Sequence, residues 1–307
     1  MKLVLFCISF VSAKYVGRVF RCGKDFSGDV CPQSLGCSQY GYCGNTDAYT
    51  KEGCQSNCYV FPITSKLPVP VSTTVTSKLI PTTTQVTIPT TITVPTTSKL
   101  PVPVPTGSIF RDSCNTQGTI ALTFDDGPSD LTYNFIMWLS NNNIPATFFV
   151  IGNKINSYIT TIQQMSRLGF EIGCHTWDHT DLTTLSDDQI RIQISSTNNL
   201  IKQVTGKYPK YFRAPYLSYN SRVENIVKEF NMLTISVNLD TFDWKYQATN
   251  PSLIYEAYLN TLPFPNNKGY ITLQHDRYVP SLDLVPKIVD YIRSQNFKMV
   301  TMNECVN

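Results

Sequence analysis

The residues of this chain best suited to metal chemistry are its three histidines, His175, His179 and His275. The first two are four residues apart, and on a helical turn that spacing would place both imidazoles on one face. Imidazole nitrogens bind divalent cations such as zinc, and the set needs a further ligand from elsewhere in the chain. The pair alone is weak evidence, because histidines at this spacing also occur on surfaces and in cores.

Two adjacent carboxylates, Asp125 and Asp126, are candidates for that further ligand and for a catalytic base. They follow an apolar segment and precede a Gly-Pro break. Because neighbouring side chains on an extended backbone diverge, one carboxylate could bind the metal while the other faces a water molecule. Metal-assisted hydrolysis needs this division of roles. The alternative is an ordinary Asp-Gly turn with two solvated acids.

Strand-like and helix-like segments alternate from residue 113 onward, and they must position these side chains. Apolar runs predict buried strands at 119–124, 146–152, 210–215, 232–239 and 270–275. Helical spacing predicts helices at 131–142, 153–168, 187–205, 222–230, 251–261 and 281–294. This alternation predicts an α/β fold, either a mostly parallel sheet or a (β/α) barrel, with active residues at the carboxyl ends of the strands.

Five short motifs occur in order along this region: TFDDGP at 123–128, HTWDH at 175–179, RAPY at 213–216, DTFDW at 240–244 and LQH at 273–275. Together they resemble the five motifs of the polysaccharide deacetylase family, the NodB-homology carbohydrate esterases. The resemblance covers about residues 114–305 and implies a distorted (β/α) barrel that removes acetyl groups from sugar polymers.

The resemblance also implies a metal site and a base. Asp126, His175 and His179 would bind one divalent metal, Zn²⁺, with Co²⁺ and Ni²⁺ as alternatives. Asp125 would be the general base, oriented and kept ionised by Arg213. A purely structural ion pair is the alternative for that arginine.

A general acid and substrate contacts follow from the same resemblance. His275 would protonate the departing amine, which is a poor leaving group otherwise. Asp243, or Asp240 as the alternative, would tune that histidine. Tyr216, through its backbone N–H, and Trp244 would contact the substrate.

The segment before this region is rich in cysteine. Six cysteines between residues 22 and 58 lie among Gly, Ser, Asn and Asp, and they permit 15 pairings that spacing alone does not resolve. Disulfides are favoured over zinc because none of these cysteines has the paired CxxC spacing that zinc sites favour. A domain of this size needs such staples to fold.

The core of this segment, CPQSLGCSQYGYCGNTDAY at 31–49, resembles the hevein-type chitin-binding module. Gly36 and Thr50 stand where the family has two paired cysteines. The resemblance implies the bridges Cys22–Cys37, Cys31–Cys43 and Cys54–Cys58. It also implies a ligand surface for N-acetylglucosamine rings formed by Ser38, Tyr40, Tyr42 and Tyr49, for which covering a tiny core is the alternative.

Composition divides the chain into four parts. Residues 1–13 resemble a signal peptide cleaved after Ala13, with a buried N-terminal strand as the alternative. Residues 20–60 hold the hevein-like module. Residues 61–112 form a Thr/Pro-rich linker suited to O-glycosylation, and residues 113–307 form the deacetylase-like domain. Neither a GPI signal nor a tail anchor is expected.

Three cysteines follow the hevein-like head (residues 20–60), and Cys7 lies in the predicted signal peptide. Cys114 and Cys305 lie at the two ends of the deacetylase-like domain, so a bridge between them is expected to close a long loop. Cys174 would remain free and buried, since adjacent side chains on a strand turn apart and it would point away from His175.

Charge and hydropathy restrict the function classes. A net charge of +3 disfavours a nucleic-acid binder, and no stretch of 18 apolar residues predicts a membrane helix. The expectation is a secreted, monomeric, metal-dependent chitin deacetylase, located outside the cell or in its wall, whose partner is chitin or another N-acetylglucosamine polymer. The alternatives are an acetylxylan or peptidoglycan deacetylase and an inactive chitin-binding wall protein.

Overall fold

The computed structural model describes residues 36–37, 43–44, 110–262 and 269–307. In the head it places two short strands, β1 (Gly36–Cys37) and β2 (Cys43–Gly44), which pair antiparallel with Cys37 opposite Cys43. The predicted signal peptide, residues 61–109 of the predicted linker, the three head disulfides and the four ligand residues Ser38, Tyr40, Tyr42 and Tyr49 lie outside the described residues. The linker was predicted to run to residue 112, but Phe110 and Arg111 form a strand that pairs with Thr234 and Ile235 of the deacetylase-like domain.

The deacetylase-like domain is built around one parallel sheet. Its strands are β3 (Phe110–Arg111), β4 (Thr119–Ala121), β5 (Thr123–Gly127), β6 (Thr147–Val150), β7 (Glu171–Cys174), β8 (Tyr211–Phe212), β9 (Leu233–Ile235), β10 (Leu239–Asp240), β11 (Tyr270–His275) and β12 (Lys298–Met299). The order is β12-β4-β11-β5-β6-β7-β8-β9-β3, and β10 pairs with β11. Within the described ranges no ladder joins β3 to β12, so the predicted barrel is not closed by strand pairing there.

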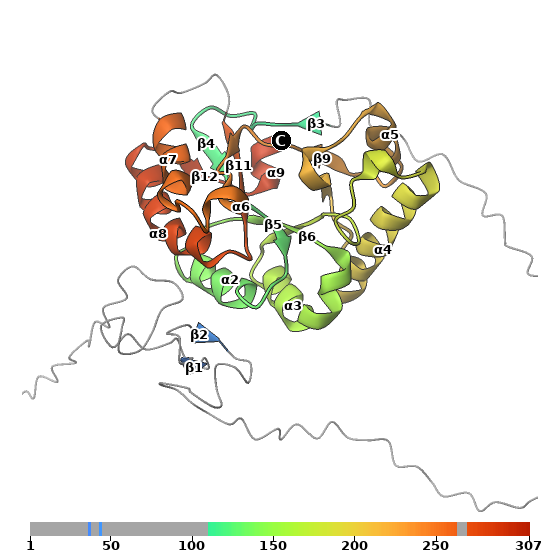
Figure 1. Ribbon diagram of the computed structural model, residues 1–307, viewed down its shortest axis with the longest axis horizontal. Coiled ribbons are helices and arrows are strands. Elements are labelled where there is room, and N and C mark those ends of the chain that lie inside the picture. Colours follow the sequence, from blue (N-terminus) through green and yellow to red (C-terminus); the bar gives the residue numbers. More distant parts are fainter. Residues whose placement is uncertain (1–35, 38–42, 45–109, 263–268) are drawn as a thin grey trace, which may run out of the picture. The chain divides into compact units, whose positions relative to one another are not determined.

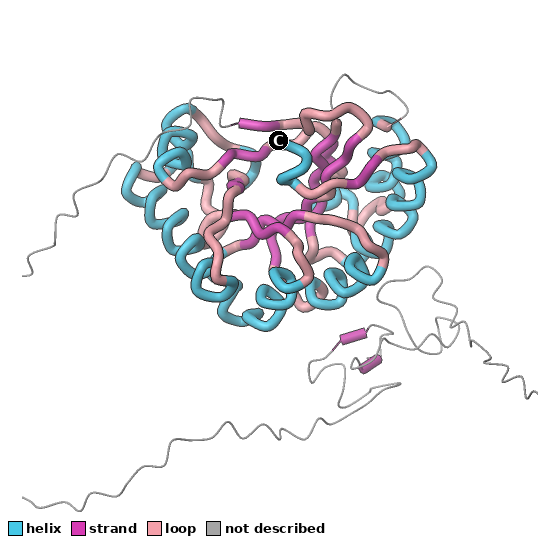
Figure 2. Tube along the Cα trace, turned by 180° about the vertical axis from the view of Figure 1, so that it is seen from behind, coloured by secondary structure: helices cyan, strands magenta, loops and turns pink. Residues whose placement is uncertain are grey.

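Helices form the outer layer around this sheet (Figure 1). The longer ones are α2 (Thr132–Asn141), α3 (Ile159–Arg167), α4 (Asp187–Thr205), α5 (Ser221–Glu229), α7 (Ser252–Thr261) and α8 (Val279–Ser294). Shorter elements are η2 (Gly152–Tyr158), η3 (Leu182–Thr184), η4 (Pro215–Leu217), α6 (Asp243–Tyr246) and α9 (Met302–Val306). The rear view shows the same arrangement, with strands inside an arc of helices (Figure 2).

Alternation along the strands divides the core into two layers. Phe148 of β6 packs outward against the helices, where its ring stacks on Phe124 and meets Phe135 edge to face. The next residue, Phe149, belongs to a second cluster with Ile271 and Met302 on the other face of the sheet. Successive side chains of a strand point to opposite faces, so one apolar run supplies both layers.

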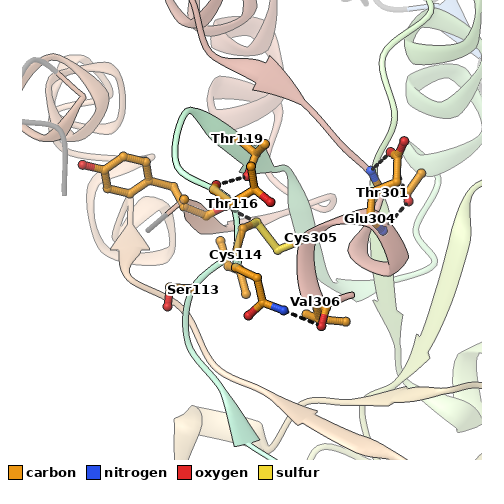
Figure 3. The surroundings of a disulfide bond; sticks show 12 residues. Ser113, Cys114, Thr116, Thr119, Thr301, Glu304, Cys305 and Val306 are labelled. Carbon is orange, nitrogen blue, oxygen red and sulfur yellow. Dashed lines mark hydrogen bonds between the residues drawn. A yellow bond between two sulfur atoms is a disulfide. The ribbon is translucent and has the colours of Figure 1, made fainter. Parts of the chain in front are cut away.

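A disulfide ties the C-terminal helix to the amino ends of the strands (Figure 3). Cys114 and Cys305 are bonded, and Asn115 donates from its side chain to the Val306 carbonyl at 2.7 Å. Thr301 and Glu304 form a capping box at the start of α9. Cys174 is free and fully buried.

No helix in the described part of the chain combines the length and apolar character needed to cross a membrane.

Most predicted elements of the domain are present, but several differ. The short elements β3, β12, α6 and α9 were not predicted, and the predicted strand 119–124 divides into β4 and β5. Strand β7, with the sequence EIGC, was not among the predicted strands. The segment 153–168 divides into η2 and α3, and 232–239 divides into β9 and the start of β10, which pair with different strands. For the strands, pairing with distant segments, and not local periodicity, decides the outcome.

Candidate metal centre and active site

Asp126, His175 and His179 meet at the carboxyl ends of β5 and β7. Oδ1 of Asp126 lies 3.4 Å from Nε2 of His175 and 3.2 Å from Nε2 of His179. That oxygen is buried and has no hydrogen-bond partner within the described residues. These three groups are the one set of potential ligands of this kind found in that part of the chain. An orphaned carboxylate oxygen facing two imidazole nitrogens fits a divalent cation.

The backbone at the end of β5 turns the two adjacent carboxylates to different partners. The pairing with β6 shifts register between Asp125 and Gly127, and Asp126 adopts a left-handed conformation with φ of 70°. A bulge of this kind re-aims a side chain next to a site. Asp125 therefore faces Arg213 while Asp126 faces the histidines.

The two histidines meet through a loop and not through the helical turn that their spacing suggested. Strand β7 ends at Cys174, and residues 175–181 are irregular. Thr176 and His179 both have positive φ, and the Thr176 hydroxyl accepts a hydrogen bond from the backbone N–H of His179 at 3.0 Å. This tight turn brings the two rings to 4.9 Å between centroids.

Hydrogen bonds and charges hold the ligands in the states that bind metals. Nδ1 of His175 lies 2.8 Å from the carbonyl oxygen of Arg213, which can only accept, so Nδ1 donates and Nε2 is the nitrogen that faces Asp126. Burial, followed by the neighbouring His175, lowers the pKa of His179 to about 4. Burial alone would raise the pKa of Asp126, but the three histidines hold it well below its usual range.

Arg213 fixes the second carboxylate. Its guanidinium is fully buried and donates to Oδ1 of Asp125 at 2.8 Å and to the Thr123 hydroxyl at 2.6 Å. The carbonyl oxygens of Ile235 and Ser236 accept from its other nitrogens, and it stacks on the ring of Phe149 at 4.1 Å. Each contact restrains the guanidinium, so Asp125 is held in one orientation.

His275 lies beside the metal ligands, at the end of β11. Its Nδ1 is 2.6 Å from Oδ1 of Asp243, and its Nε2 is 3.8 Å from Oδ2 of Asp126. Burial alone would lower the pKa of His275, but the hydrogen bond and charge of Asp243 outweigh it and raise the pKa to about 9. The imidazole is therefore protonated at neutral pH.

Asp243 is the carboxylate that contacts this histidine. It is fully buried and also accepts from the backbone N–H of His275 at 2.8 Å and from the Ser281 hydroxyl at 2.7 Å. Asp240, the alternative, accepts instead from the backbone N–H of Phe242 at 2.8 Å. The two acids of the DTFDW motif thus have different partners.

The two residues predicted to contact substrate are exposed near these groups. The side chain of Tyr216 is 72% exposed, and its ring lies 4.6 Å from that of His179. Trp244 is 53% exposed and directly follows Asp243, to which its backbone N–H donates at 2.9 Å. Aromatic rings left exposed beside a polar site suit contact with sugar rings.

Sequence reasoning missed three charged residues at this site. Lys154 donates to the carbonyl oxygen of Asp126 at 2.7 Å, and Nε of Arg277 lies 3.3 Å from Oδ2 of the same residue. Asp276 is fully buried, and burial raises its pKa to about 7. Their position directly after β6 and β11 was the available signal, because strand ends gather at one edge.

Comparisons with known proteins agree with this geometry. Residues 112–235 match the family model described as polysaccharide deacetylase, and residues 21–58 match the one described as chitin recognition protein. A chitin deacetylase of Pestalotiopsis sp. is 31% identical over 66% of this chain and 68% of its own length. For a chitin deacetylase of Colletotrichum lindemuthianum the identity is 34%, over 66% of this chain and 85% of the relative.

The solved structure of the chitin deacetylase from Colletotrichum lindemuthianum superposes with a TM-score of 0.63, covering 67% of this chain and 93% of that one, at 34% identity. The chain therefore belongs to the polysaccharide deacetylase family. That family uses a divalent metal, and the Asp126, His175 and His179 cluster is where this chain could bind one.

Proposed function

We propose that this chain is a secreted chitin deacetylase, which hydrolyses the N-acetyl groups of N-acetylglucosamine polymers to free amines and acetate. The observation that carries the proposal is the cluster of His175, His179 and Asp126 beside two further groups, a carboxylate and an imidazole. The carboxylate is Asp125, bound to Arg213, and the imidazole is His275, protonated and bound to Asp243. The names of the relatives support the substrate class.

Asp126, His175 and His179 would hold the metal, for which we propose Zn²⁺. When bound, the ion would supply Lewis-acid polarisation of the acetyl carbonyl and acidification of water. Asp125 is the proposed general base, which takes a proton as the water oxygen attacks the carbonyl carbon. Arg213 holds this carboxylate in place for that transfer.

His275 is the proposed general acid. As the C–N bond breaks, its imidazolium gives a proton to the departing nitrogen, so that a neutral amine leaves. Asp243 keeps that imidazolium charged and oriented. The backbone N–H of Tyr216 is proposed to donate to the developing oxyanion, and the exposed rings of Tyr216 and Trp244 to contact the sugar.

The N-terminal segment completes the proposal. Residues 20–60 are proposed to form a chitin-binding module, supported by the family match at 21–58. Residues 61–109 would tether it to the catalytic domain, whose sheet includes β3 at Phe110–Arg111, after removal of residues 1–13. A tethered module raises the local concentration of polymer at the active site without a new contact to it.

The test is acetate release by the zinc-loaded protein from chitin oligomers, peptidoglycan and acetylxylan, with Asp125→Asn as the control. We expect release from chitin oligomers that the substitution abolishes. Release from another polymer alone would refute the substrate class. Absence of release from all three would refute the enzyme and favour a binding protein.

A further inference from the structure

A buried carboxylate that the proposed mechanism does not use lies behind the metal ligands. Asp276 directly follows His275 at the end of β11 and is fully buried. Its Oδ2 accepts from the hydroxyl of Thr132 at 2.6 Å, and that hydroxyl accepts from the backbone N–H of Ser129 at 2.8 Å. The side chain thereby reaches the loop that follows Asp126.

The backbone of Asp276 is joined to the same loop. Its carbonyl oxygen accepts from the Ser129 hydroxyl at 2.7 Å, and its N–H lies 3.4 Å from the carbonyl oxygen of Asp125. Residues 125–132 are therefore attached to the end of β11 at three places. These attachments lie on both sides of the bulge that aims Asp126, at Asp125 before it and at Ser129 and Thr132 after it.

Gly127, the residue after Asp126, lies directly against this carboxylate. A Cβ at this position would come within 2.3 Å of Oδ2 and 2.5 Å of Oδ1 of Asp276. The φ of Gly127 is not in the left-handed region, so close approach, and not backbone conformation, requires glycine there. Oδ1 of Asp276 has no hydrogen-bond partner in the described part of the chain.

Burying a carboxylate that has one unpaired oxygen destabilises a fold, whereas an apolar side chain at the same position would not. We infer that Asp276 is a positioning residue for the metal centre, which acts through Thr132, Ser129 and Gly127 to fix the Asp126 carboxylate opposite His175 and His179. This inference rests on the proposed function only in taking those three residues as the metal ligands.

The experiment measures the affinity of the full chain for Zn²⁺ by competition with a chromophoric chelator, together with the visible spectrum of the Co²⁺ form. Asp276→Ala and Thr132→Val are compared with the matched controls Asp276→Asn, which keeps an acceptor, and Thr132→Ser, which keeps the hydroxyl. We expect about 10- to 100-fold weaker binding and an altered Co²⁺ spectrum for the first two, and most of the affinity retained in the controls.

The double variant Thr132→Val/Asp276→Ala is expected to bind no more weakly than the weaker single variant, because both remove the same link. Circular dichroism and thermal unfolding show whether each variant is folded. If Asp276→Ala does not fold, the near-isosteric Thr132→Val decides the matter alone. Folded variants with the affinity and spectrum of the unsubstituted chain would overturn the inference.

This readout is independent of catalysis. A chain that binds zinc but releases no acetate would refute the proposed function and leave the inference standing. Unchanged affinity in Thr132→Val, with acetate release intact, would refute the inference alone.

Discussion

At the two ends of the strands in the deacetylase domain, different kinds of residue adopt the left-handed backbone conformation. In residues 110–262 and 269–307, the turns that lead into strands place only Gly or Asn at positive φ, namely Gly118, Asn143, Gly169, Gly206, Asn231 and Asn296. The carboxyl ends of the strands and the loops that follow them place other residue types there, namely Asp126, Thr176, His179, Tyr216, Leu217 and Phe242. Gly and Asn, and to a lesser extent Asp and His, adopt this region at low cost, whereas Thr, Tyr, Leu and Phe do not.

This difference indicates that one end of the strands contributes stability and the other end carries the chemistry. Strained residues cost on the order of 1–3 kcal/mol each and persist where the surrounding structure holds them for function. The amino ends of the strands, here called the entry ends, carry the Cys114–Cys305 disulfide. At the same ends, Glu171 accepts a hydrogen bond at 3.1 Å from the backbone N–H of Asn303, which belongs to α9. The carboxyl ends of the strands are called the exit ends. Parallel α/β folds place catalysis at the exit ends and stabilising contacts at the entry ends, and this chain follows that division.

The largest effect is expected at the exit ends, for Asp125→Asn. Loss of the proposed base should lower kcat by about 10²- to 10⁴-fold, because the amide cannot accept the water proton. Zinc affinity and the unfolding midpoint should change little, since Asn can still accept from Arg213. Acetate release and zinc competition measure both, and a variant that loses zinc would show that the separation of roles is wrong.

A residue at the exit ends, His275, should also set the alkaline limit of activity. His275 works in its protonated form, which is present below its raised pKa of about 9 and is lost as the pH rises through that value. Removing the negative charge in Asp243→Asn lowers this pKa, so the alkaline limb of the pH–rate profile should move to lower pH.

Asp240→Asn is the matched control for that profile. Its carboxylate contacts the backbone N–H of Phe242, so a smaller shift is expected. Equal shifts in the two variants would contradict the assignment of Asp243 as the partner of His275.

At the entry ends, removal of the disulfide should affect stability alone. Cys114→Ala/Cys305→Ala opens a loop of 191 residues and should cost about 2–5 kcal/mol of unfolding free energy. Denaturant titration measures this loss, and kcat at a temperature where the variant is folded should be unchanged. A large fall in kcat would show that the two ends are coupled.

The smallest expected effects come from replacing one left-handed residue at each end of the strands. Phe242→Gly should stabilise the chain by up to about 1 kcal/mol, because glycine adopts positive φ without a Cβ clash. Asn231→Ala, at the entry end, should destabilise it by about 1 kcal/mol for the converse reason. Thermal unfolding of both variants provides the measurement, and stabilisation by Asn231→Ala would contradict the interpretation.

Much of this arrangement was predictable from the sequence, because the motifs combine local pattern with specific chemistry. The segment TIALTF predicted a buried strand followed by two carboxylates, which the structure divides into β4 and β5 with the carboxylates inside β5. Cys114 and Cys305 were expected to pair from their positions at the domain ends, and they do. Strand β7 was missed because EIGC contains Glu and Gly, which are unfavourable in strands, and it forms by pairing with β6 and β8.

The turn between His175 and His179 could not be predicted from spacing. A four-residue interval is as compatible with a helical turn as with the irregular loop that forms here. Thr176 and His179 have positive φ, and a contact distant in sequence holds this loop, in which the backbone N–H of Trp177 donates to the side chain of Gln193 at 2.8 Å. Asp276 was overlooked for a related reason. Its importance depends on burial and on contact with Gly127, which no local pattern reveals.

The most direct test of the central claim is to measure acetate and free amine together when the zinc-loaded full chain acts on N-acetylglucosamine oligomers, before and after removal of the metal with a chelator. The account predicts equal amounts of the two products, loss of both on chelation and recovery of both on addition of zinc. No acetate from the zinc-loaded chain, or product formation unaffected by chelation, would contradict it.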